Sequence, residues 1–187
     1  MPETLLIDRE DVKIMNWIFK GKCHKFGDNI PVDDGIITMK MIRDRETRPE
    51  VLAQHVMENI DPDFINRVKP GDLLVAGKRF GLGNPHAQGF RGIKGLGVGL
   101  VVDWMPRGSY RNCVIAGVPV IPKCSGILDH VSDGDELEVN FENGLIKNCT
   151  TGVEIQGEPM PPYLREIIGA GGSTGYLKKQ LEENQDK

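Results

Sequence analysis

The stretch from Gly81 to Ala87 contains residue types that proton transfer and anion binding require. His86 is the side chain in this stretch that exchanges protons near neutral pH, so it could act as a general acid or base. The Asn84 amide could orient a carboxylate, and turns at Gly81 and Gly83 could bring backbone N–H groups near an anion. A solvated loop histidine and glycines needed for tight packing explain the same residues, and the sequence leaves both interpretations open.

A β-α-β-α-β alternation positions this stretch. Residues 72–76 form a short apolar run between glycine-containing turns, which is typical of a buried strand. Residues 98–102 and 118–121 have the same character, and helices are predicted over 87–96 and 107–116. The reactive stretch therefore follows a buried strand and leads into a helix.

The flanking segments are predicted from their local patterns. Before the alternation, the patterns predict strands over 12–19 and 21–26, a long loop over 29–48 with an extended piece at 35–39, a helix from Pro49 with Thr47 as its cap, and a helical turn at Asp61-Pro62. After it, they predict strands over 136–141 and 145–148 joined at Asn143-Gly144, a helix from Pro161-Pro162 to Ile168 closed by Gly169, and a polar, fraying tail over about 179–187. Residues 1–187 are expected to form a single domain.

The composition excludes several classes of protein. The chain has a formal charge of −4 without a basic stripe, so nucleic-acid binding is not expected. Its longest apolar runs are far below the roughly 20 residues that span a bilayer, so no membrane association is expected. The acidic N-terminus does not resemble a signal peptide, and the predicted compartment is the cytoplasm.

The cysteines do not predict a metal site. Cys23, Cys113, Cys124 and Cys149 are scattered and form no CxxC pair. Iron-sulfur clusters are held by cysteine thiolates that usually include two or three close neighbours in sequence. We therefore expect buried or free thiols, and no metal or cluster bound by this chain alone.

Several short segments resemble a known family in their order and spacing. They are residues 25–30, 70–77, 80–83, 110–112, 133–139, 143–148 and 150–152. Together they span most of the chain and resemble the small subunit of 3-isopropylmalate dehydratase and of its homoaconitase and dimethylmalate dehydratase relatives, within the aconitase family.

The resemblance implies a fold, a reaction and a partner. The implied fold is α/β, an aconitase-type swivelling β/β/α domain, which agrees with the mixture of alternating elements and a terminal meander. The implied function is that of a hydro-lyase or isomerase small subunit, as in leucine biosynthesis, acting on a 2-hydroxy di- or tricarboxylic acid. In such enzymes a large subunit carries a [4Fe-4S] cluster, so this chain is expected to bind no cofactor and to be active only with that partner.

The chain departs from the family at its catalytic motif. The family usually has Gly-Ser-Ser-Arg-Glu, with a serine as the base and the arginine on a carboxylate, where this chain has residues 83–87, Gly-Asn-Pro-His-Ala. Pro85 has neither a hydroxyl nor a backbone donor. His86 and Asn84 are therefore the candidate catalytic residues, and an altered substrate or proton-transfer group is expected.

Cationic side chains are the candidate substrate-binding residues. Arg107 and Arg111 match arginines of the family, and a planar guanidinium would grip a carboxylate there. Lys40 and Arg43 are the nearest counterparts of the family's substrate-recognition loop, and Gly83 could present a backbone N–H to an anion. An exposed helix face and a charged, flexible loop are the alternative interpretations.

Two rival functions remain open. The chain could serve ordinary 3-isopropylmalate isomerisation with a different serine, such as Ser109, near the substrate. It could instead be a non-catalytic swivel-domain protein with a regulatory or binding role.

Overall fold

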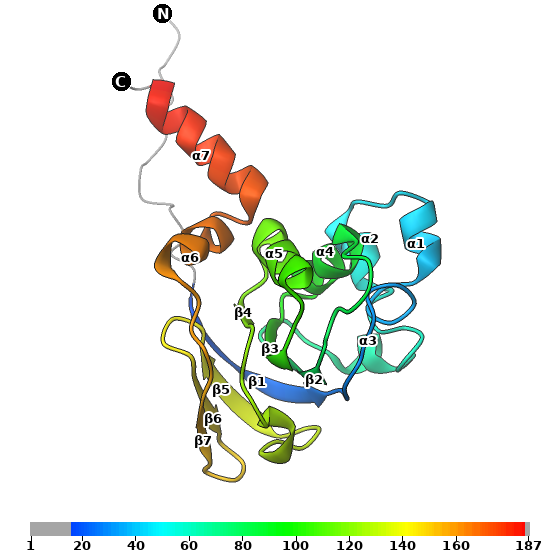
Figure 1. Ribbon diagram of the computed structural model, residues 1–187, viewed down its shortest axis with the longest axis vertical. Helices are drawn as coiled ribbons and strands as arrows, with labels where there is room; N and C mark the ends of the chain where they lie inside the picture. The colour runs from blue at the N-terminus through cyan, green and yellow to red at the C-terminus, as the bar shows by residue number, and fades with distance from the viewer. Residues whose placement is uncertain (1–15, 186–187) are drawn as a thin grey trace, which may run out of the picture.

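The computed structural model describes residues 16–185, in which the strands form one curved sheet (Figure 1). The strand order in the described part is β4-β3-β2-β1-β5-β6-β7. Strands β1 to β4 are parallel, whereas β5, β6 and β7 continue the sheet antiparallel from β1. The strands are β1 (Ile18–Lys25), β2 (Leu73–Lys78), β3 (Gly99–Trp104), β4 (Val120–Ile121), β5 (Glu136–Asn140), β6 (Leu145–Asn148) and β7 (Glu154–Gln156).

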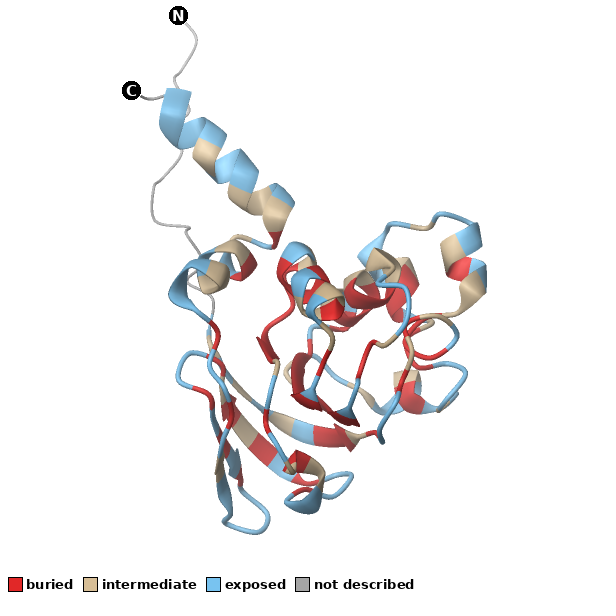
Figure 2. Ribbon diagram, in the orientation of Figure 1, coloured by how far each residue is buried: buried red, intermediate tan, exposed pale blue. Residues whose placement is uncertain are grey.

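The α-helices gather on one side of the parallel strands. They are α1 (Met39–Arg43), α2 (Pro49–Ala53), α3 (Phe64–Arg67), α4 (Ala87–Leu96), α5 (Arg107–Ala116), α6 (Pro162–Gly169) and α7 (Ser173–Gln185). A short 3-10 helix, η1 (Ile127–Asp129), lies on the other side, where Ile127 packs in the cluster shared with the antiparallel strands. In Figure 1, α4 and α5 lie over β2 and β3, whereas α7 projects away from the sheet. Figure 2 shows that burial is concentrated in these strands and on the faces of α4 and α5 that meet them.

Strand β2 is buried on both faces because two apolar layers cover it. Leu74 and Ala76 belong to the cluster that packs against the helices, whereas Leu73 and Val75 belong to the cluster shared with the antiparallel strands. A continuous apolar run, unlike an alternating one, suits a strand with two covered faces. Each large apolar side chain buried in this way stabilises the fold by about 1.5–3 kcal/mol. The end of β2 is therefore tightly packed and fixes where the following loop begins.

The central alternation predicted from the sequence is confirmed. Helices α4 and α5 begin and end at the predicted residues, and each ends before a glycine in the left-handed conformation. Strands β3 and β4 lie within two residues of the predicted ranges, and β5 and β6 pair as the predicted hairpin.

Four peripheral expectations differ from the structure. The strands predicted over 12–19 and 21–26 form one continuous strand in the described residues, β1. The predicted loop over 29–48 contains the short helix α1, which is anchored by buried Met41. Arg48, not Thr47, is the N-cap residue of the helix that begins at Pro49, and this helix has only five residues. The expected fraying tail is helical to Gln185 as part of α7. Residues 12–15 of the first predicted strand lie outside the described part of the chain.

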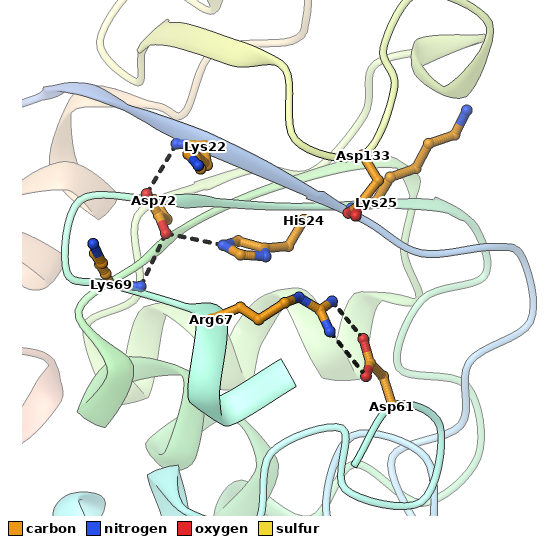
Figure 3. Close-up of polar contacts among 8 residues, drawn as sticks. All are labelled: Lys22, His24, Lys25, Asp61, Arg67, Lys69, Asp72 and Asp133. Carbon is orange, nitrogen blue, oxygen red and sulfur yellow. Dashed lines mark hydrogen bonds and ion pairs between the residues drawn. The ribbon is translucent and has the colours of Figure 1, made fainter. Parts of the chain in front are cut away.

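A buried carboxylate ties β1 to the start of β2 (Figure 3). Asp72 accepts hydrogen bonds from the backbone N–H groups of Lys22 and Lys69, both at 2.9 Å. It also lies 2.9 Å from His24 Nε2, and both side chains are less than a tenth exposed. Burial alone raises the pKa of Asp72, but the bonds from His24 and the two amides outweigh burial and leave that pKa lowered. His24 is therefore held in a structural pair on β1.

Candidate functional site

The loop that leaves β2 contains the residues singled out by their chemistry. Gly81 and Gly83 have φ values of 78° and 88°, a region that favours glycine. At Gly81 a Cβ atom would lie 2.6 Å from Ser109 Oγ, so tight packing explains this glycine. At Gly83 nothing lies within 4 Å, and the residue is exposed. The first glycine is thus structural, while the second remains accessible to an anion.

Helix α5 holds this loop in place through two buried polar side chains. The Ser109 hydroxyl donates to the carbonyl oxygen of Gly81 at 2.5 Å, and the Asn112 side chain donates to that of Pro85. Ser109 is only 1% exposed. The rival prediction that Ser109 approaches the substrate is therefore wrong, because its hydroxyl is enclosed and already committed to the loop backbone.

His86 forms a close pair with an aspartate that sequence reasoning had not selected. Its Nδ1 atom lies 2.6 Å from Asp33 Oδ1, and both side chains are about one-third exposed. His86 is the N-cap residue of α4, but its side chain makes no capping hydrogen bond and turns to Asp33 instead. When Nδ1 carries the proton donated to the carboxylate, Nε2 retains the lone pair of a base.

The segment before Asp33 runs beside the loop and brings the pair together. The N–H of Gly81 donates to the Ile30 carbonyl at 2.7 Å, and the N–H of Val32 donates to the Leu82 carbonyl at 3.0 Å. These bonds align residues 29–33 with residues 79–82. Asp33 and His86 are 53 positions apart in the sequence, so no local pattern could have identified Asp33 as the partner of His86.

Asn84 lies on the same turn as His86. Its carbonyl oxygen accepts the His86 backbone N–H at 2.9 Å, and the residue is exposed. Within residues 16–185, its side-chain amide has no hydrogen-bond partner. The amide is therefore free to meet a polar ligand beside the imidazole.

Of the two candidate arginines on α5, only Arg107 lies next to this turn. Arg107 is exposed at the start of α5, next to Gly108, where a Cβ atom would lie 3.1 Å from Pro85. Arg111 is exposed one helical turn further along. The N-terminus of α5 thus abuts the loop near Arg107, and Arg111 lies more remotely.

The structure does not bring Lys40 or Arg43 to the pair. Both are exposed on α1, and the Lys40 ammonium binds Asp44, the C-cap residue of this helix, at 2.9 Å. In the described part of the chain, no hydrogen bond or ion pair joins either residue to Asp33 or His86.

Two cavities lie at opposite ends of β2. One of about 520 Å³ borders His24 and Asp72 at the start of the strand. The other, of about 350 Å³, borders Lys78 and Asp103 where β2 and β3 end. Open parallel sheets commonly bind ligands outside the carboxyl ends of their strands, which is where the smaller cavity lies, but none of the candidate residues lines it.

The donor groups of residues 16–185 do not fit a metal cluster. Within residues 16–185, no three His, Cys, Asp or Glu side chains come together as a metal site. Burial raises the pKa of Cys23 to about 12 and that of Cys124 to about 11, and it also raises the pKa of Cys113. Thiolates are the metal-binding form, and these three thiols are held protonated.

Burial also predicts how the thiols react. Iodoacetamide is expected to add once to the native chain, at exposed Cys149, because Cys23, Cys113 and Cys124 are buried and protonated. Intact-mass measurement should show one adduct under native conditions and four in denaturant. A second native adduct would contradict the packing of these residues.

Within residues 16–185, no helix combines the length and the apolar character needed to cross a membrane.

Comparisons with known proteins give a consistent set of relatives. Models of known protein families give no match. An isopropylmalate/citramalate isomerase small subunit from Methanocaldococcus jannaschii is 44% identical over 172 residues, covering 91% of this chain and 100% of that protein. A 3-isopropylmalate dehydratase small subunit from Caldicellulosiruptor bescii is 39% identical over 168 residues, covering 89% and 99%.

A third relative and a solved structure agree with these. The 3-isopropylmalate dehydratase small subunit 1 of Thermotoga maritima is 42% identical over 163 residues, covering 87% of this chain and 96% of that protein. The crystal structure of 3-isopropylmalate dehydratase from Methanocaldococcus jannaschii matches with a TM-score of 0.80 and 35% identity. That match covers 91% of this chain and 99% of the other. Sequence and fold therefore agree over nearly the whole of both chains.

Proposed function

Because the chain belongs to the family of 3-isopropylmalate dehydratase small subunits, we propose that it forms one side of the active site of a two-subunit hydro-lyase. The α/β fold expected from the family resemblance, an aconitase-type swivelling domain, is confirmed by the match to the solved relative. The relatives support the enzyme-subunit interpretation over a non-catalytic swivel protein. The proposed partner is a large subunit, and the proposed substrate is a 2-hydroxy di- or tricarboxylic acid.

The chemistry divides between the two subunits. Removing water from a hydroxy acid requires a base for a carbon-bound proton, an acceptor for the hydroxyl and cations for the carboxylates. A [4Fe-4S] cluster in the large subunit would act as the Lewis acid for the departing hydroxyl. The residues of this chain would supply the other two requirements.

The Asp33–His86 pair is the observation that carries this proposal. His86 Nδ1 lies 2.6 Å from Asp33 Oδ1, and in the tautomer that donates Nδ1–H to this carboxylate Nε2 keeps its lone pair and would face the substrate. His86 would accept the proton at Nε2, and the carboxylate would stabilise the resulting imidazolium and keep the ring in place. Asn84, on the same turn, would orient a carboxylate through its amide.

Reconstitution tests the proposed function. We expect the isolated chain to be inactive and to gain dehydratase turnover when mixed with the cluster-bearing large subunit of its source. A panel of 3-isopropylmalate, citramalate and tricarboxylic hydroxy acids, assayed by absorbance of the unsaturated product, would identify the substrate class. Full turnover by the isolated chain, or failure of the two chains to associate, would contradict the proposal.

A further inference from the structure

Arg79 lies where β2 ends, and we propose that its guanidinium binds a carboxylate of the hydroxy-acid substrate. This inference rests on the proposed function and adds a residue that was not among the candidates. Its basis is an unusual backbone, an oriented side chain and a partner, Asn29, that lies four positions before Asp33.

The backbone of Arg79 is in a conformation that arginine rarely adopts. Its φ is 59°, in the left-handed region, which is unfavourable for a residue with a Cβ atom. Asn29, which faces it, has a φ of 61°, and its N–H donates to the Lys78 carbonyl at 2.7 Å. Backbone strain of this kind persists where the surroundings enforce it, and it clusters at functional sites.

The side chain of Arg79 is held in one orientation by a neutral partner, so no acidic group offsets its positive charge. Its Nε–H donates to Asn29 Oδ1 at 2.5 Å, and the residue is exposed. Within residues 16–185, its two Nη groups have no hydrogen-bond or ion-pair partner. Asp28, the nearest acid in sequence, accepts the Lys78 backbone N–H instead.

Other arginines with fixed side chains differ in this respect. Arg48, Arg67 and Arg165 are each held by a carboxylate of the chain. Arg79 is held by a neutral amide oxygen, so its full positive charge and both terminal nitrogens remain available. A preoriented guanidinium fork matches a carboxylate in two parallel hydrogen bonds.

The two polar pairs lie along two neighbouring strips of chain. Residues 29–33 run beside residues 79–82, with the Arg79–Asn29 pair at their start. Asp33 ends the first strip, and its partner His86 follows the second strip by four positions. Asn29 and Asp33 are four positions apart, so their Cα atoms are at most about 14 Å from each other. Side chains reaching inward from both pairs would hold a small dicarboxylate by one carboxylate while its C–H faces His86.

Substitutions at Arg79 test the inference in the reconstituted enzyme. Arg79→Asn should raise KM about 10- to 100-fold with little change in kcat, as expected for a charge-assisted pair that binds ground and transition states alike. Arg79→Lys, which keeps the charge but loses the fork, should give an intermediate KM. Stability toward urea should be unchanged or higher in Arg79→Asn, because asparagine tolerates the left-handed conformation.

Arg45→Asn is the matched control, since Arg45 is also exposed and has a φ of 53°. It should leave KM unchanged. Wild-type KM in Arg79→Asn would overturn the inference while leaving the proposed function intact. Lost stability in Arg79→Asn together with normal KM in Arg79→Lys would also overturn it, because Arg79 would then be structural. Absence of turnover by the wild-type pair on every hydroxy acid tested would overturn both.

Discussion

His86→Ala is expected to lower kcat of the reconstituted pair by about 10²- to 10⁴-fold, the usual contribution of a general acid or base. The loss should appear in kcat and in kcat/KM equally, because proton transfer occurs only in the transition state. His55→Ala is a matched control, since His55 is paired with Glu58 at 2.8 Å and, within residues 16–185, has no hydrogen bond or ion pair with the loop after β2. An unchanged kcat in His86→Ala would exclude His86 as the proton-transfer group.

Asp33→Asn extends this test to the partner of the imidazole. An amide at this position can donate from its NH₂ group to Nδ1, which favours the tautomer with the proton on Nε2. Nε2 then cannot accept a proton, so kcat should fall substantially while the fold is retained. Asp34→Asn is the control one residue away, because Asp34 accepts the Met39 backbone N–H instead of His86. If both substitutions lower kcat alike, the effect lies in the loop and not in the pair.

Asp72→Ala is expected to destabilise the fold by about 3–5 kcal/mol, the cost of breaking a buried pair. The substitution removes the partner of His24 and leaves the N–H groups of Lys22 and Lys69 without their acceptor. Urea unfolding followed by circular dichroism would measure the change. In Glu138→Ala, which breaks an exposed 3.8 Å pair with Lys20, the change should be at most about 1 kcal/mol. Equal losses in the two variants would contradict the role of Asp72.

The same carboxylate predicts how stability depends on pH. The pKa of Asp72 is lowered in the folded chain, so near its folded pKa the unfolded chain binds more protons. Its stabilising contribution is therefore fully present above the unfolded value of about 3.9 and is lost as pH falls through the folded pKa. Asp72→Ala should accordingly show a weaker loss of stability than the wild type as the pH falls below about 4.

The sequence predicted best the elements whose signals are local. Helices α4 and α5 were recognised at their observed ends because apolar periodicity and a closing glycine lie within the helices themselves. Helix α1 was missed, since a helix of five residues is too short to be stable alone and depends on burial of Met41 against the rest of the fold. Helix α7 was missed because its face is mostly polar.

By itself the sequence determined the family, the order of the central strands and helices, and the replacement of the usual catalytic motif by one containing His86. Only the tertiary structure decided which groups meet: Asp33 with His86, Asn29 with Arg79, and Ser109 with the loop backbone. These partners are 28 to 53 positions apart. Periodicity reports the environment of a single element, whereas such pairings depend on how the sheet sets separate segments side by side.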